Sequence, residues 1–258
     1  MTNTLFYSVW SEFKMEQTVI SEKNEKNEQK TKLDSPGFTI DFSGKKIVFV
    51  RHGKSVWNLD FRYQGRTDIE LCQEGIEGAV RVAKRLKQFP AEAIISSPLK
   101  RAFATAEIIS SECGGVPVEK EPLLIEADFG KLEGKTIQEV NEIYGKEFFM
   151  QWKKNLLDNT SFGGESAEEI ISRHQKFVKK LLERREKNIV LVGHGAEARA
   201  LFIALLGEAP SSIFWKCAVE NCSISTFLQK GESFFLYTLN DMLHHKVPLD
   251  AISKIPIF

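Results

Sequence analysis

Three short and uninterrupted apolar runs constrain the fold of this chain more than any other feature. They are KKIVFV at 45–50, AEAIISS at 91–97 and NIVLVGH at 188–194. A continuous apolar run of this length is typical of a strand that is covered on both faces. Because amphipathic helical patterns lie between the runs, we expect an α/β domain with a largely parallel sheet.

The helical patterns and one hairpin complete this expectation. A first apolar helix face is formed by Ile76, Ala79, Val80, Ala83 and Leu86. A second, between 170 and 182, includes His174, which we interpret as a core histidine. Pro98 suits the start of a helix directly after the second run. Near the C-terminus, NCSISTFLQ and SFFLYTLN flank Lys230-Gly231 and predict a hairpin.

The charge balance of the chain argues against several classes of partner. Lysine plus arginine and aspartate plus glutamate each total 35 in 258 residues, so the formal net charge is zero. We therefore expect no nucleic acid and no anionic membrane surface as a partner. No apolar run approaches the roughly 18–20 residues that span a bilayer. The 4 cysteines form no CxxC pair and have no zinc spacing, which indicates free thiols in a reducing compartment.

The first forty residues differ in composition from the rest. Residues 18–37, TVISEKNEKNEQKTKLDSPG, are polar and of mixed charge, and they cannot bury enough apolar surface to fold. We predict a flexible N-terminal extension over 1–40 and one domain over 41–258. The start of the chain has no basic region and only a broken apolar stretch, so we expect no secretory signal and a cytoplasmic location. The sequence leaves the oligomeric state open.

Charged side chains follow the expected strands at the edge where ligands bind in α/β sheets. Arg51 and His52 follow the first run, Arg101 opens the helix after the second, His194 follows the third, and Glu126 lies in a loop. Arginine forks match phosphate oxygens, an imidazole can act as nucleophile, and a carboxylic acid can protonate a leaving oxygen. The set therefore predicts phosphoryl chemistry in which side-chain cations stabilise the charge, with no metal and no cofactor.

Several sequence blocks, taken together, resemble the histidine phosphatase (phosphoglycerate mutase-like) superfamily. They are RHGKSVWN, RYQGRTDIELCQEG, SSPLKRAFATAEII, IEADFGKLEG, GGES and LVGHGAEARAL, and they occur in the order of the family. The resemblance implies a three-layer α/β/α fold with a mostly parallel sheet. It also implies a reaction that passes through a phosphohistidine.

The resemblance assigns a role to each charged residue. His52 would be the nucleophile, and Glu126 would be the general acid and later the base that activates water. Arg51 and Arg101 would clamp the phosphoryl group. His194 would stabilise the oxygens of that group during transfer, most usefully as an imidazolium.

Further residues are implied on the substrate side. Asn58 and Ser55 would contact the phosphate or the substrate, and Gln64 and Gly65 would line the substrate side. For Gln64 and Gly65, a plain turn is the competing interpretation. Gly195, at the start of a helix, would bind the substrate by offering its backbone N–H to the phosphate.

Residues around the expected site separate the branches of this family. Lys54 stands where the mutases carry a glutamate, no arginine pair lies between Glu126 and Gly163, and the segment between LEG and GGES is short. These features favour a metal-independent phosphomonoesterase that acts on a small phosphorylated metabolite. A cofactor-dependent phosphoglycerate mutase is the alternative, and an inactive relative that serves as a binding module is a lesser one. The secreted acid phosphatases are disfavoured, because Gly195 stands where they carry an aspartate.

Overall fold

A computed structural model describes residues 44–154, 158–207 and 216–245 of the chain. The predicted flexible extension over 1–40 lies outside these residues, so it stays a prediction, as does a domain that starts at residue 41. Within the described residues, no helix is long and apolar enough to cross a membrane.

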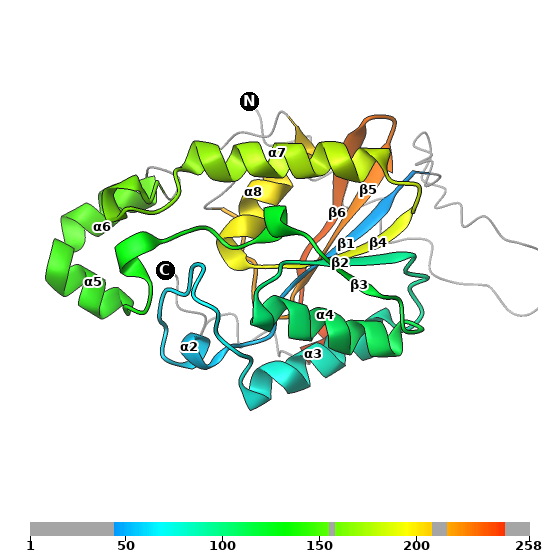
Figure 1. Ribbon diagram of the computed structural model, residues 1–258, viewed down its shortest axis with the longest axis horizontal. Coiled ribbons are helices and arrows are strands. Elements are labelled where there is room, and N and C mark those ends of the chain that lie inside the picture. Colours follow the sequence, from blue (N-terminus) through cyan, green and yellow to red (C-terminus); the bar gives the residue numbers. More distant parts are fainter. Residues whose placement is uncertain (1–43, 155–157, 208–215, 246–258) are drawn as a thin grey trace, which may run out of the picture. The chain divides into compact units, whose positions relative to one another are not determined.

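A six-stranded sheet forms the centre of the described domain (Figure 1). Its strands are β1 (Lys46–Arg51), β2 (Ala93–Ser96), β3 (Val118–Lys120), β4 (Asn188–Gly193), β5 (Ile224–Lys230) and β6 (Ser233–Asp241). Their order is β3-β2-β4-β1-β5-β6, in which the first four pair in parallel and β5 pairs antiparallel with both β1 and β6. The three apolar runs are thus neighbouring strands, and the predicted hairpin is confirmed as β5 and β6.

The described part of the chain also contains α-helices. They are α2 (Val56–Leu59), α3 (Gln73–Leu86), α4 (Lys100–Glu112), α5 (Ile137–Tyr144), α6 (Lys146–Lys154), α7 (Ala167–Glu183) and α8 (Gly195–Leu206). Single turns of 3-10 helix occur at η1 (Pro122–Leu124), η2 (Gly130–Leu132), η3 (Thr160–Phe162) and η5 (Leu243–His245).

Two apolar clusters join the helices to the sheet in three layers. Val48 and Val50 of β1 pack with α3 and α4 on one face. Ile47 and Phe49 pack with α7 and α8 on the other face, and Figure 1 shows the two helix pairs on opposite sides of the strands. Alternate residues of β1 point into different layers, as the two-residue period of a strand requires. The three-layer α/β/α fold predicted from the sequence is confirmed.

A third apolar cluster holds a helical extension beside the sheet. α5 and α6 lie at the left of Figure 1, away from the strands. Their buried side chains meet those of η2, η3 and α7, among them Leu132, Val140, Trp152, Phe162 and Ile170. The extension is therefore built by the segment between η2 and η3.

The first turn of α3 packs against the loop after β1, and glycine makes this contact possible. A Cβ on Gly75 would lie 2.0 Å from the carbonyl oxygen of Lys54, and a Cβ on Gly53 would lie 2.4 Å from that of Gly75. The glycine side of α3 therefore faces inward. The predicted apolar face is wrong at Ile76, which is 39% exposed, and at Val80, which is half-buried.

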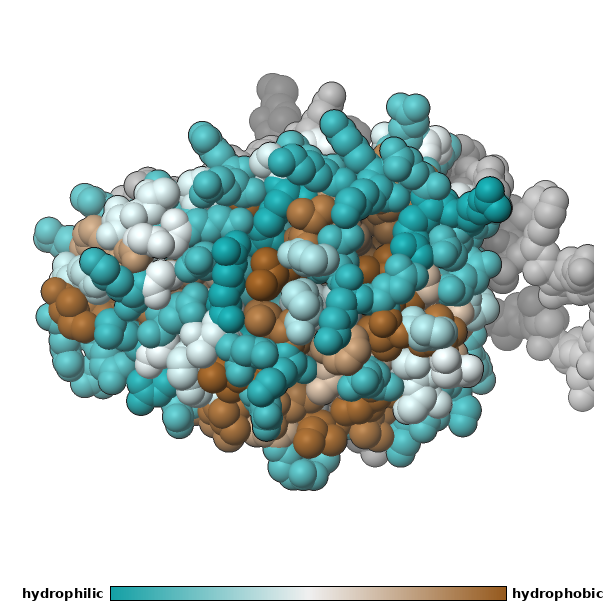
Figure 2. Space-filling model, in the orientation of Figure 1, coloured by the Kyte–Doolittle hydropathy of each residue, from teal (hydrophilic) through white to brown (hydrophobic). Residues whose placement is uncertain are grey.

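Hydrophilic side chains cover most of the face seen in Figure 2, and apolar side chains gather near its lower edge over α2 and α3. Among the exposed apolar residues of these two helices are Val56, Leu59 and Ile76. The apolar side chain of Ile76 is thus exposed on the surface, which a helical pattern alone does not distinguish from a core face.

Candidate active site

The parallel pairing of β1 with β4 brings two histidines together. Arg51 pairs with Gly193 at the carboxyl ends of the two strands, so His52 and His194 follow side by side. The backbone N–H of His52 donates to the carbonyl oxygen of Gly193 at 2.9 Å. The two imidazole rings lie 5.1 Å apart between centroids, and both side chains are buried.

The His52 ring is held in one tautomer by its own loop. Its Nδ1 lies 2.6 Å from the carbonyl oxygen of Gly53. Because a carbonyl oxygen only accepts hydrogen bonds, Nδ1 carries the proton and Nε2 keeps its lone pair. Burial lowers the pKa of His52 well below its usual 6.5, and the charges of Arg101 and Arg51 lower it further. A neutral imidazole with a bare Nε2 has the form that a nucleophile requires.

Arg101 presents a buried guanidinium beside the histidines. α4 begins at Lys100, two residues after Pro98, so Arg101 lies in its first turn as predicted. Its two terminal nitrogens donate to the carbonyl oxygens of Gly65 at 2.8 Å and Thr67 at 2.9 Å, whereas Nε has no protein partner. Burial lowers the pKa of Arg101 to about 10, so the guanidinium is still charged at neutral pH. The two carbonyl groups therefore hold a fixed cation.

Arg51 places a second guanidinium at the same edge. It donates to the carbonyl oxygen of Val219 at 2.5 Å, and its buried Nε has no protein partner. Burial lowers the pKa of Arg51, while Glu220 and Glu126 oppose that change. A Cβ on Gly195 would lie 3.4 Å from the Arg51 Cζ, so Arg51 lies against the start of α8.

His194 is also neutral in this arrangement. Its Nε2 lies 2.7 Å from the hydroxyl oxygen of Ser97, and its buried Nδ1 has no protein partner. Burial lowers the pKa of His194 well below 6.5, and Arg101, His52 and Arg51 add to this effect. The imidazolium expected from the sequence is therefore disfavoured here, because the protein's own cations surround the ring.

The Glu126 carboxylate lies on the N-terminus of α8. Its oxygens accept the backbone N–H groups of Gly195 at 3.1 Å, Ala196 at 3.3 Å and Glu197 at 2.8 Å, together with that of Ala127 at 2.9 Å. A carboxylate is the natural partner of the unpaired N–H groups in a first helical turn. The Gly195 N–H, predicted to bind a phosphate, therefore donates to Glu126 in this structure.

The other predicted substrate residues lie together but contact one another. Ser55 is fully buried, its hydroxyl lies 2.7 Å from Gln64 Oε1, and it caps α2. The Oδ1 atom of Asn58 accepts the Ser55 N–H at 2.9 Å. Gly65 adopts a φ of 53°, and its carbonyl oxygen accepts a hydrogen bond from Arg101. These residues form the turn that orients Arg101, and their contact with a substrate stays a prediction.

Sequence reasoning missed three polar residues that hold the site. Thr105 accepts the Gly53 N–H at 3.0 Å, and Asn221 donates to the His52 carbonyl oxygen at 3.0 Å. Ser97, described above, contacts the second histidine. Thr105 lies one helical turn after Arg101, and this spacing on α4 is a signal that could have found it. Asn221 and Ser97 occupy strand-adjacent positions without such a signal.

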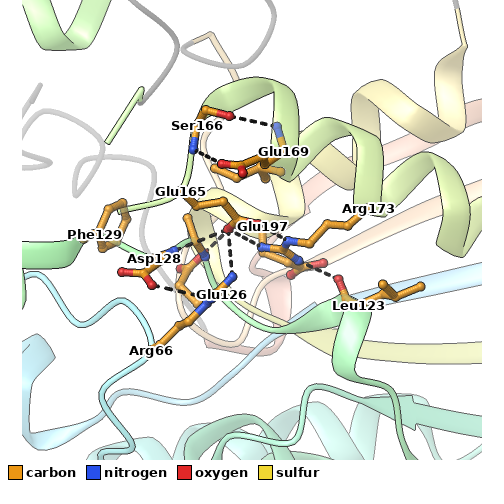
Figure 3. A network of polar contacts seen from close by, with 12 residues as sticks. Arg66, Leu123, Glu126, Asp128, Phe129, Glu165, Ser166, Glu169, Arg173 and Glu197 are labelled. Carbon is orange, nitrogen blue, oxygen red and sulfur yellow. Dashed lines mark hydrogen bonds and ion pairs between the residues drawn. The ribbon is translucent and has the colours of Figure 1, made fainter. Parts of the chain in front are cut away.

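A network of ion pairs and hydrogen bonds stabilises the loop that carries Glu126 (Figure 3). Arg173 donates to Glu165 at 2.9 Å and to the carbonyl oxygen of Leu123 at 2.6 Å. Glu165 accepts the Asp128 N–H at 3.4 Å, and its N–H donates to the Asp128 carbonyl oxygen at 3.0 Å. The pair therefore holds the loop on both sides of Glu126.

His174 is confirmed as a buried histidine of α7, although it is not surrounded by apolar groups alone. Its Nε2 lies 3.2 Å from the Glu197 carboxyl group, and both side chains are fully buried.

Within the described parts of the chain, no group of three or more histidine, cysteine, aspartate or glutamate side chains has an arrangement that could hold a metal ion.

The chain belongs to the histidine phosphatase superfamily (branch 1), whose family model matches residues 47–242. It is 34% identical over 200 residues to phosphoserine phosphatase 1 of Hydrogenobacter thermophilus, covering 77% of this chain and 93% of that protein. It is 34% identical over 209 residues to phosphoglycerate mutase-like protein 4 of Arabidopsis thaliana, covering 80% and 88%.

A solved relative has the same fold. It is a phosphoserine phosphatase mutant from Entamoeba histolytica in complex with phosphoserine, with a TM-score of 0.66 and 31% sequence identity. The match covers 78% of this chain and 98% of that one. The family expected from the sequence is confirmed, whereas the individual residue roles stay predictions.

Proposed function

We propose that this chain is a metal-independent phosphomonoesterase that acts on a small phosphorylated metabolite through a phosphohistidine on His52. One observation carries the proposal: the His52 imidazole is neutral, its Nδ1 donates to the carbonyl oxygen of Gly53, and its Nε2 keeps its lone pair in a site where Arg101 and Arg51 act on the ring electrostatically. A neutral imidazole with a free lone pair near fixed cations suits phosphoryl transfer to nitrogen.

In the first step, Nε2 attacks the phosphorus while the bond from phosphorus to the ester oxygen breaks. Arg51 and Arg101 bind the phosphoryl oxygens. The negative charge of the bound phosphate also offsets their effect on His194, which can then take up a proton from solvent and donate an N–H hydrogen bond to a phosphoryl oxygen. The leaving oxygen accepts a proton from the carboxylic acid form of Glu126, which becomes the carboxylate.

In the second step, water attacks the phosphohistidine and the bond from phosphorus to Nε2 breaks. The Glu126 carboxylate takes the proton of that water, and inorganic phosphate is released. Glu126 accepts four backbone N–H groups where it now lies. Its side chain must therefore turn away from α8 to donate or accept this proton.

Rapid-quench labelling tests the intermediate. Acid-labile, base-stable phosphate should appear on the chain and map to His52. His52→Ala should lose the label and the turnover, whereas His194→Ala should keep slow labelling, because it removes a stabilising group and leaves the nucleophile. Label that maps to His194, or that persists in His52→Ala, would overturn the assignment.

A panel of substrates separates hydrolysis from the mutase reaction. Phosphoserine, named in one relative, and other phosphorylated metabolites should release phosphate in EDTA, since the described cations can stabilise the charge. The panel should include 3-phosphoglycerate with a trace of 2,3-bisphosphoglycerate. Isomerisation without phosphate release would establish the mutase alternative, and magnesium-dependent turnover would refute the metal-independent mechanism.

A further inference from the structure

A second glutamate lies directly behind the candidate site. Glu197 is the third residue of α8, and its side chain is fully buried. Its Oε2 atom accepts the backbone N–H of His194 at 2.8 Å, and its Oε1 atom lies 3.2 Å from Nε2 of His174 on α7. Figure 3 shows Glu197 in the same polar network as Glu126 and Arg173. The proposed reaction assigns no role to this group.

The tautomer of His174 follows from its neighbours. Nδ1 lies 2.7 Å from the carbonyl oxygen of Ile170, so Nδ1 carries the ring proton. Burial, followed by the charge of Arg173, lowers the pKa of His174 to about 3, so the ring is neutral at pH 7. Its Nε2 is then a bare acceptor, and the nearby Arg173 nitrogen at 3.5 Å is compatible with that state.

This tautomer decides where the Glu197 proton lies. An ionised Oε1 and a bare Nε2 are both acceptors, so they would repel each other across 3.2 Å. A proton on Oε1 turns the same contact into a hydrogen bond from Glu197 to His174. Burial raises the pKa of Glu197 well above 4.5, and the Glu126 charge acts in the same direction, although the His194 N–H and the charge of Arg173 oppose it.

The charged groups around the pair act in opposite directions, because Glu126 favours a neutral Glu197 and Arg173 opposes it. On α7, Arg173 is already paired with Glu165 at 2.9 Å, so it has a counter-charge of its own. On the loop side, Glu126 accepts the Glu197 N–H, which brings a negative charge close to the Glu197 side chain. The alternative, an imidazolium facing a carboxylate, holds the same number of protons but separates charge in a dry interior.

We propose that Glu197 is a buried carboxylic acid that donates a hydrogen bond from its own proton to Nε2 of His174. We also propose that Glu197 is a positioning residue for His194. The positioning part rests on the proposed phosphatase function. The acid fixes the backbone of His194 where the strand ends and α8 begins. Because it is neutral, it does so without adding a second negative charge beside Glu126 and the phosphoryl site.

Two substitutions separate hydrogen bonding from charge. Glu197→Gln keeps an oxygen for the His194 N–H and offers an amide N–H to His174, so it should retain kcat and KM. Glu197→Leu keeps the approximate volume without either bond, and a displaced His194 should lower kcat by about 10- to 100-fold at unchanged KM. Glu168→Leu is the control, since Glu168 lies exposed in the first turn of α7. A folded Glu197→Gln as inactive as Glu197→Leu would overturn the proposal.

Spectroscopy tests the proton without turnover. The infrared difference between wild type and Glu197→Gln at pH 7 should contain the carbonyl band of a protonated carboxylic acid. Nitrogen NMR should show His174 as the neutral Nδ1–H tautomer, and the His194 ring signals should move in Glu197→Leu but not in Glu197→Gln. A carboxylate band for Glu197 or an imidazolium at His174 would refute the proposal, whether or not the chain hydrolyses phosphomonoesters.

The pH dependence of stability gives a further readout for cases in which Glu197→Leu does not fold. Above about pH 6.5 the unfolded His174 is neutral and the unfolded Glu197 is ionised. Unfolding the wild type then releases the Glu197 proton, so its urea midpoint should fall as pH rises from there. Glu197→Gln has no such proton and should keep a flatter midpoint. Parallel curves for the two proteins would contradict a protonated Glu197.

Discussion

Replacement of Arg101 by methionine should lower turnover strongly while leaving the chain folded. Methionine keeps a straight, flexible side chain in the space of the buried arginine stem. It removes the positive charge and the two hydrogen bonds to the carbonyl oxygens of Gly65 and Thr67. The two consequences for stability have opposite signs, and the structure gives the size of each.

The charge of Arg101 is costly to the folded chain. A lowering of its pKa from 12.5 to about 10 corresponds to about 3 kcal/mol, because one pKa unit is worth about 1.4 kcal/mol. Against this, its hydrogen bonds to the carbonyl oxygens of Gly65 and Thr67 stabilise the fold by about 1.5–3 kcal/mol each. The free energy of unfolding should therefore fall by no more than about 3 kcal/mol, and the variant should stay folded.

The turnover of Arg101→Met should fall by a large factor. Loss of one preorganised donor at a phosphoryl site typically lowers the rate by about 10²–10³. Phosphate release at saturating substrate measures this change, and urea unfolding of the same samples measures the stability. Lys100→Met is the matched control, because Lys100 is the exposed neighbour whose partner is Glu70 at 3.3 Å. Near wild-type turnover in Arg101→Met would remove Arg101 from the site.

Three other predictions concern the nucleophile, its loop and the N-terminal extension. Since the pKa of His52 lies well below 6.5, kcat/KM should not fall on acidification from pH 7 to roughly pH 6, and an acid limb centred at 6.5 or above would contradict a neutral His52. Gly53→Ala should destabilise the domain by about 1–3 kcal/mol or more in urea unfolding, because the new Cβ would lie 2.4 Å from the Gly75 carbonyl oxygen; an unchanged midpoint would show that the loop can move. Deletion of residues 1–36 should leave turnover of small substrates unchanged, and a large loss of kcat in a folded protein would show that the extension helps to build the site.

The pattern of the sequence was sufficient for the fold class, and it grouped the residues of the candidate site. The apolar runs around Val48, Ile94 and Val190 are buried strands, and their burial on both faces made them visible as continuous runs. Residues directly after such strands meet at one edge of a parallel sheet, so Arg51, His52 and His194 could be grouped before any contact was known. The prediction of the apolar face of α3 was wrong at Ile76, because a close backbone contact at glycine carries no hydropathy signal.

Only the tertiary structure decided the state of the charged groups. The contact of Glu126 with the Glu197 N–H joins residues 71 positions apart, and the contact of Glu197 with His174 joins residues 23 positions apart. No local pattern encodes such pairs, because they arise when α7, α8 and the Glu126 loop pack together. Burial and neighbouring charge then set each tautomer and each pKa, so the sequence determined which side chains reach the site, and packing determined where their protons lie.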